Sequence, residues 1–102
     1  EFVGAIRRLT EEHGALMICD EVQSGIFRTG LPYGFQNFGV LPDIVTMAKG
    51  IASGVVAGAC AAKSSIAAAF APGDHGTTFG GPTAPRAGGA RLRPYERYRP
   101  HP

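Results

Sequence analysis

The residues of this sequence best suited to chemistry are Asp20 and Lys49, because each directly follows a short apolar run. Asp20 follows the run at 15–19, and Lys49 follows the run at 44–48. If both runs are buried strands of one parallel sheet, their carboxyl ends form the crevice in which open sheets bind ligands. An amine and a carboxylate would then share one site. Taken singly, each has a simpler interpretation, since a lysine at a strand end is commonly exposed and aspartate commonly begins a turn.

A third polar segment gives this pair a specific chemical meaning. Thr77 and Thr78 lie in the glycine-rich segment 76–81. Pyridoxal phosphate needs an amine to bond its aldehyde, a carboxylate to keep its ring nitrogen protonated, and hydroxyl and backbone N–H groups around its phosphate. The three groups together predict a pyridoxal-phosphate site in which Lys49 forms a Schiff base.

Periodicity predicts the elements that position these residues. Apolar residues at helical spacing predict a helix that begins near Phe2 and that Gly14 ends. Ser64 is placed to cap a brief helix. Short apolar runs predict strands at 15–19, 44–47 and 55–62. The sequence therefore predicts an α/β fold with a mostly parallel sheet flanked by helices.

Charge and composition limit the possible classes of function. Residues 1–81 hold five basic and seven acidic side chains, a net charge of −2, whereas 82–102 hold five basic and one acidic, a net charge of +4. Because the basicity belongs to the Pro/Arg-rich tail, no general case for nucleic-acid binding follows, and the tail is expected to be disordered or frame-shifted.

Cys19 and Cys60 predict two reduced core thiols and no metal site. No apolar stretch reaches the ~20 residues of a membrane helix, so a cytoplasmic protein without a membrane partner is expected.

Three ordered motifs resemble those of class III pyridoxal-phosphate-dependent aminotransferases. The sequence DEVQSG at 20–25, followed by RTG at 28–30, is similar to their aspartate segment. PDIVTMAKG at 42–50 is similar to their Schiff-base lysine segment, and GDHGTTFGG at 73–81 to their trans phosphate loop. Asp20 and Lys49 are 29 positions apart, and so are Lys49 and Thr78, as in the acetylornithine branch. The resemblance implies that 1–81 are part of the pyridoxal-phosphate-binding large domain, with the aspartate aminotransferase-like fold.

The resemblance also implies a role for each matching residue. Lys49 would hold the cofactor and move the substrate proton, and Asp20 would pair with the ring nitrogen. Val22 would pack on the ring face, and Gln23 would lie near the phenolic oxygen. Glu21 belongs to the same cofactor-binding segment, although its place on the opposite side of the chain favours a structural contact.

The trans loop implies a homodimer. Thr78 would bind the phosphate of the cofactor in the partner subunit, and Thr77 would lie near the substrate. Arg28 has two interpretations, a ligand for a substrate carboxylate or a structural residue, and the resemblance favours the second.

The reaction implied is amino transfer from an acetylornithine- or ornithine-like donor to a 2-oxo acid, as in arginine biosynthesis. The alternatives are a 4-aminobutyrate or other ω-amino acid aminotransferase, a glutamate-1-semialdehyde aminomutase, or, outside enzymes, an inactive truncated remnant. The chain departs from the family pattern after 81, and the proline expected beyond Lys49 is absent. Complete members are several times longer, so we expect these 102 residues alone to be an inactive fragment.

Overall fold

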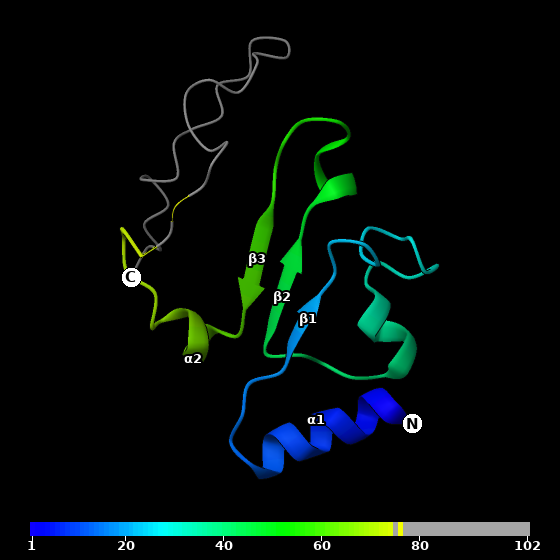
Figure 1. Ribbon diagram of the computed structural model, residues 1–102, viewed down its shortest axis with the longest axis vertical. Coiled ribbons are helices and arrows are strands. Elements are labelled where there is room, and N and C mark those ends of the chain that lie inside the picture. Colours follow the sequence, from blue (N-terminus) through cyan, green and yellow to red (C-terminus); the bar gives the residue numbers. More distant parts are fainter. Residues whose placement is uncertain (75, 77–102) are drawn as a thin grey trace.

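The computed structural model describes residues 1–74 and 76 (Figure 1). Thr77, Thr78 and the Pro/Arg-rich tail therefore lie outside the described residues. The elements, in chain order, are α1 (Phe2–Glu12), β1 (Ile18–Asp20), the 3₁₀ helix η1 (Gly34–Phe38), β2 (Ile44–Met47), the 3₁₀ helix η2 (Lys49–Ala52), β3 (Ala59–Ala62) and α2 (Ser64–Ala67).

Helix α1 confirms the prediction from apolar periodicity. It ends at Glu12, and Gly14 follows in the left-handed conformation with φ of 62°, which costs glycine little because it has no Cβ. Within α1, Arg7 Nε lies 3.0 Å from Glu11 Oε1, one helical turn away. Helix α2 begins one residue earlier than predicted, because Lys63 rather than Ser64 is the N-cap, and no side chain caps the helix.

The three strands form one mixed sheet in the order β1-β2-β3. Strands β1 and β2 are parallel, with Ile18 opposite Ile44 and Asp20 opposite Thr46, whereas β2 and β3 are antiparallel. The α/β fold is confirmed, and the described sheet has one pairing of each kind. The connection between β2 and β3 spans 48–58, which is shorter than the dozen or so residues that a parallel crossover needs, so the chain returns antiparallel.

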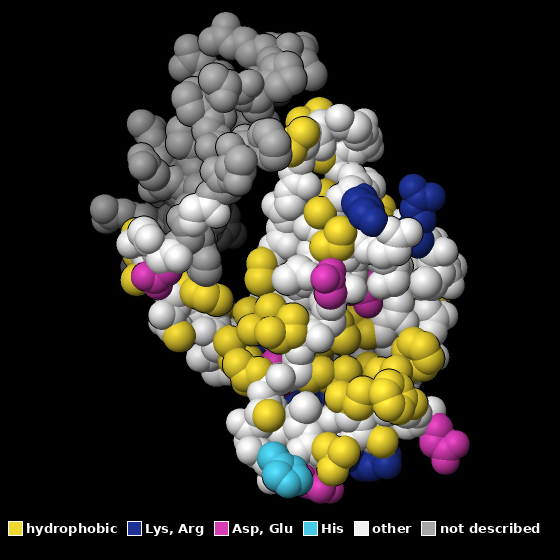
Figure 2. Space-filling view, in the orientation of Figure 1, with side chains coloured by type: hydrophobic (Ala, Val, Ile, Leu, Met, Phe, Trp, Pro, Cys, Tyr) yellow, Lys and Arg dark blue, Asp and Glu magenta, His cyan; other side chains and the backbone are white. Residues whose placement is uncertain are grey.

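The apolar core of the described residues is small. Met17 and Met47 are its buried apolar side chains, whereas Phe2 is 77% exposed and Ile18 is 59% exposed. Figure 2 shows apolar side chains gathered in a band across the described part of the molecule. The prediction of two core thiols is wrong for Cys60, which is exposed on the edge strand β3, while Cys19 is half-buried. Among the described residues, no helix has the length and apolar character to cross a membrane.

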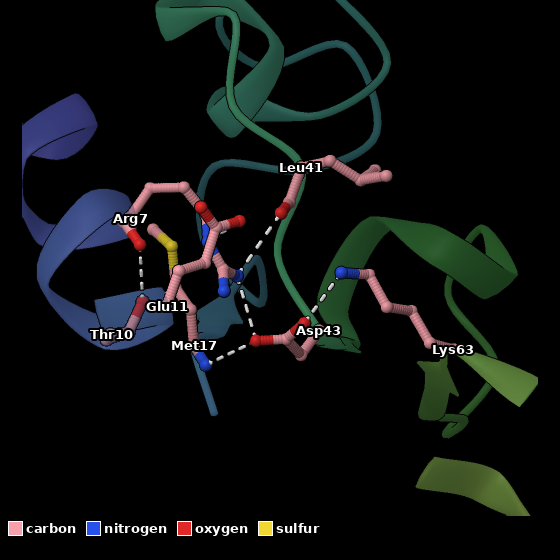
Figure 3. Close-up of polar contacts among 7 residues, drawn as sticks. All are labelled: Arg7, Thr10, Glu11, Met17, Leu41, Asp43 and Lys63. Atoms are coloured by element: carbon pink, nitrogen blue, oxygen red, sulfur yellow. Dashed lines mark hydrogen bonds and ion pairs between the residues drawn. The ribbon is translucent and has the colours of Figure 1, made fainter. Parts of the chain in front are cut away.

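A buried carboxylate joins the elements that the small core leaves loosely packed (Figure 3). Asp43 Oδ2 accepts hydrogen bonds from Arg7 Nη1 and from Met17 N, both at 2.8 Å, and Asp43 Oδ1 accepts one from Lys63 Nζ at 2.7 Å. These donors come from α1, from the residue before β1 and from the residue after β3. The hydrogen bond from Lys63, with those from Met17 N and Arg7, holds the pKa of Asp43 well below its usual range. We call these four residues, Arg7, Met17, Asp43 and Lys63, the Asp43 cluster.

The loop after β1 contains two adjacent non-glycine residues in the left-handed conformation. Ile26 has φ of 55° and Phe27 has φ of 62°, a region that the Cβ of an L-residue disfavours. The Phe27 side chain is 66% exposed, so it recovers little of this cost by burial. The loop is therefore held by its neighbours against the preference of its own residues.

We expect Phe27→Gly to raise the free energy of unfolding by about 1 kcal/mol, because glycine adopts positive φ without the Cβ clash. The urea unfolding midpoint of the chain measures this gain. Phe27→Ala is the matched control and should give no gain, because alanine keeps the Cβ. Equal midpoints for the glycine and alanine variants would contradict this account of the loop.

Candidate functional site

The two chemically suited residues lie at the same edge of the sheet. Asp20 is the last residue of β1 and is paired with Thr46 of β2. Lys49 begins η2, two residues after β2 ends. Since β1 and β2 are parallel, both residues emerge at the carboxyl end of their strand, which is the edge where parallel sheets bind ligands.

The Asp20 carboxylate is held through one of its oxygens. Oδ1 accepts hydrogen bonds from Val22 N and from Thr46 Oγ1, both at 3.1 Å. Among the described residues, Oδ2 has no hydrogen-bond donor. The carboxylate is therefore oriented by the protein and keeps one oxygen for a further donor.

Lys49 is held by a side chain from the loop that follows β1. Its Nζ donates a hydrogen bond to Gln23 Oε1, and its backbone is left-handed with φ of 48°. Strained backbone of this kind is frequent at ligand sites, where neighbouring structure maintains it. The lysine amine thus has a defined position at the carboxyl end of β2.

Two neighbouring cavities share Ser24 and Thr29 in their linings. The larger, of about 580 Å³, is lined by Val22, Gln23 and Lys49 together with Arg28. The smaller, of about 390 Å³, is lined by Asp20, Glu21 and Cys19. The structure therefore brings three of the predicted residues to one cavity and places Asp20 on the wall of the neighbouring one.

Glu21 binds its own chain. It is 3% exposed, its Oε2 accepts from Ser24 Oγ at 2.7 Å and from Gly34 N at 2.9 Å, and its Oε1 accepts from Phe35 N at 2.9 Å. Burial raises the pKa of Glu21, but the three hydrogen bonds outweigh burial and leave this pKa below its ordinary value. Because both oxygens are occupied, the structure places Glu21 in a structural contact that holds the loop at 33–35.

Glycine is required at position 34 by the approach of this carboxylate. A Cβ on Gly34 would lie 3.0 Å from Ser24 Cβ and 3.2 Å from Glu21 Oε2, which is tighter than ordinary contact. The glycine thus lets the backbone N–H of the loop reach the buried oxygen.

Sequence reasoning missed two residues of this region. Thr46 orients Asp20, and its only signal is a lone hydroxyl in the apolar run 44–47, opposite the aspartate. Cys19 lines the smaller cavity, where burial, the largest cause, raises the pKa of its thiol, with a smaller contribution from the charge of Glu21. The roles predicted for Thr77 and Thr78 fall on residues outside the described part of the chain.

Comparison with known proteins gives one consistent result. The sequence profile described as aminotransferase class-III matches residues 1–97. Acetylornithine aminotransferase of Methanopyrus kandleri is 55% identical over 80 residues, which cover 78% of this chain and 21% of that protein. The chain spans about a fifth of the length of such curated relatives.

Solved structures agree with the sequence comparison. Ornithine delta-aminotransferase of Plasmodium falciparum superposes with a TM-score of 0.70 and 29% identity, covering 76% of this chain and 21% of that one. Taurine:2-oxoglutarate aminotransferase of Bifidobacterium kashiwanohense, solved in complex with PLP and glutamate, gives a TM-score of 0.62 and 41% identity, covering 66% of this chain and 15% of that one.

Proposed function

The chain belongs to the class-III aminotransferase family, and we propose on that premise that it carries the lysine–aspartate segment of a pyridoxal-phosphate-dependent amino transfer. The matched residues cover only about a fifth of the length of the curated relatives, so the activity proposed is that of an enzyme containing this segment. The observation that carries the proposal is the hydrogen bond of Lys49 Nζ to Gln23 Oε1 on the wall of a cavity beside Asp20.

The residues present fit pyridoxal phosphate. A cavity of about 580 Å³ lies within the range of roughly 300–1,000 Å³ usual for cofactor and ligand sites. The Lys49 amine lines it, and Asp20 lines the neighbouring cavity with an Oδ2 that accepts no hydrogen bond from the described residues. When bound, the cofactor supplies an aldehyde and an electron-withdrawing ring.

The chain's own residues would bind the cofactor, position it and move the substrate proton. Lys49 would bind the aldehyde carbon through its amine and later move a proton at the substrate α-carbon. Asp20, oriented by Thr46 and by Val22 N, would hold the proton on the ring nitrogen through Oδ2. Gln23 would position the Lys49 amine before the cofactor arrives.

The substrates proposed are an acetylornithine- or ornithine-like amino donor and a 2-oxo acid, because relatives with those names match most of this chain. Similarity to a taurine aminotransferase supports an ω-amine donor as the second candidate. The homodimer, with Thr78 reaching the partner's cofactor and Thr77 near the substrate, the place in arginine biosynthesis and the cytoplasmic location stay predictions.

Reductive trapping tests the proposal. The chain is incubated with pyridoxal phosphate, reduced with borohydride, digested and mapped by mass spectrometry. We expect Lys49 to carry about tenfold more label than Lys63, a preference equivalent to ~1.4 kcal/mol. Lys63 is an internal control, because its Nζ is held 2.7 Å from Asp43 Oδ1.

Loss of the label in Lys49→Ala would complete the result. Label spread equally over Lys49, Lys63 and the amino terminus would contradict specific cofactor binding. That outcome would leave family membership untouched, since membership rests on sequence and fold.

A further inference from the structure

Asp43 is a buried ionisable residue that the proposed chemistry does not use, and it contacts the chain on both sides of β2. Toward β1, Asp43 N donates to Met17 O and Met17 N donates to Asp43 Oδ2, both at 2.8 Å. Toward β3, Lys63 N donates to Asp43 O at 3.0 Å, and Lys63 Nζ donates to Asp43 Oδ1 at 2.7 Å. Figure 3 shows the carboxylate between Met17 and Lys63. Asp43 thus makes one backbone and one carboxylate hydrogen bond to each neighbour.

These contacts are shielded from water. Met17 and Asp43 are each 7% exposed, and Arg7 Nη1 donates to the same Oδ2 at 2.8 Å. A charged acceptor makes stronger hydrogen bonds than a neutral one, and the exclusion of water strengthens them further. The pair formed by Met17 and Asp43 is therefore a fixed point in the alignment of β1 with β2.

The strands themselves specify this alignment weakly. Strand β1 has three residues, of which Ile18 and Asp20 are exposed and Cys19 is half-buried. Strand β3 consists of three alanines and one cysteine, and it exposes all of them except Ala62. A register is strongly specified where one face of the strands is buried and weakly where neither face is. A contact outside the apolar pattern must therefore fix which residues lie opposite each other.

The register decides where the Asp20 carboxylate lies in the candidate site. Asp20 and Thr46 lie opposite each other, each three positions beyond the Met17–Asp43 pair, which is about 10 Å along a strand. A slip of one residue would move Asp20 by about 3.3 Å along β2 and turn its side chain to the other face of the sheet. The hydrogen bond from Thr46 Oγ1 that orients the carboxylate would then be lost.

We propose that Asp43 is a positioning residue for the candidate site, because it sets the β1–β2 register that brings Asp20 opposite Thr46 and to the same sheet edge as Lys49. The inference rests on the proposed function and adds to it a residue at the opposite end of the strands. Asp43 lines neither cavity, so it acts on the site through the strands alone.

Nuclear magnetic resonance of the full 102-residue chain tests the register without any cofactor. Glu21 N donates to Thr46 O at 2.9 Å, and the scalar coupling across a hydrogen bond identifies its acceptor. We expect this coupling in the unaltered chain. In Asp43→Asn, which keeps the shape of the side chain without its charge, the coupling should lose at least about half its size, because it is averaged over the registers that the strands populate.

Lys63→Met is the matched control. It removes the ion pair with Asp43 but leaves both hydrogen bonds between Asp43 and Met17. We expect this variant to lower the urea unfolding midpoint and to keep the coupling at full size. Asp43→Glu is the second test variant, because it keeps the charge for Arg7 and Lys63 while its longer side chain moves the carboxylate away from Met17 N. It should also weaken the coupling, and it decides the result if Asp43→Asn has the amide spectrum of an unfolded chain.

Trapping of pyridoxal phosphate reports on the site itself. We expect about fivefold less label at Lys49 in Asp43→Asn and unchanged label in Lys63→Met, because small displacements far from the reacting atoms reduce reactivity strongly. The label is measured relative to that at the amino terminus, since Lys63 is absent from one variant.

Three outcomes would overturn the inference. They are full coupling in the Asp43 variants, an equal loss of coupling in Lys63→Met, and a weakened coupling with undiminished label at Lys49. Absence of label at Lys49 in the unaltered chain would refute the cofactor proposal instead. The coupling would still decide whether Asp43 sets the register, since it is measured without cofactor.

Discussion

Asp43→Ala should loosen the contacts that hold α1, the start of β1 and the end of β3 together. Met17 N and Lys63 Nζ would lose their acceptor at once, and Arg7 Nη1 would keep only its longer hydrogen bond to Leu41 O. Because Asp43 is 7% exposed, water cannot fully replace the missing carboxylate. We expect the Met17 amide to exchange its hydrogen at least about a hundredfold faster, and the signals of β1 and β2 to lose dispersion.

We expect Asp43→Ala to have a large effect because few other contacts stabilise the described residues. Met17 and Met47 are the buried apolar side chains, so apolar burial contributes little cohesion. Within the described residues, the side-chain hydrogen bonds that join α1 to the segment before β2 come from Arg7. Asp74→Ala is the matched control, since that exposed aspartate accepts a local hydrogen bond from Ala71 N and should leave β1 and β2 intact. Undiminished protection of Met17 in Asp43→Ala would contradict the role of the Asp43 cluster.

Acid should reproduce the effect of this substitution. The pKa of Asp43 is lower in the folded chain than in the unfolded chain, so the unfolded state binds the proton more tightly. The stabilisation by Asp43 is therefore complete above the unfolded pKa of about 3.9 and is lost as the pH falls toward the folded pKa. Circular dichroism between pH 7 and pH 2 should show unfolding below about pH 4, and this dependence should be weaker in Asp43→Asn.

Local patterns predicted the elements, and long-range contacts explain what the patterns missed. Helix α1 and the left-handed Gly14 that follows its end are predicted by spacing within 14 residues. The partners of Asp43, in contrast, lie 36, 26 and 20 residues away, and no periodicity reports on such distances. The antiparallel direction of β3 depends on the length of the connection at 48–58, which the apolar runs alone do not reveal.

The candidate site divides in the same way. The apolar runs placed Asp20 and Lys49 at one edge of the sheet, because both runs end at an ionisable residue. The runs did not predict that the two residues would line separate cavities. Ile26 and Phe27 in left-handed conformation could not be predicted, because the local preference of both residues opposes it.

Glu21→Ala should lower the free energy of unfolding by about 3 kcal/mol, which is the second large effect expected of a single change. The alanine leaves Gly34 N, Phe35 N and the Ser24 hydroxyl without their acceptor. Gly34 is buried, so its N–H would lose a partner that water does not readily replace. We expect the Gly34 and Phe35 amides to exchange about a hundredfold faster, the factor equivalent to ~2.7 kcal/mol.

The same change should also reach the Lys49 cavity. Glu21 fixes Ser24, and Ser24 lines the larger cavity beside Gln23, which holds the Lys49 amine. Trapping of pyridoxal phosphate at Lys49 should therefore fall in Glu21→Ala. Glu12→Ala, which removes an exposed carboxylate from α1, should change stability by less than about 0.5 kcal/mol and leave trapping unaltered.

A stable Glu21→Ala chain with normal exchange at Gly34 and Phe35 would mean that the loop is held by other contacts. A destabilised chain with normal trapping would separate the structural role of Glu21 from the chemistry of its neighbours.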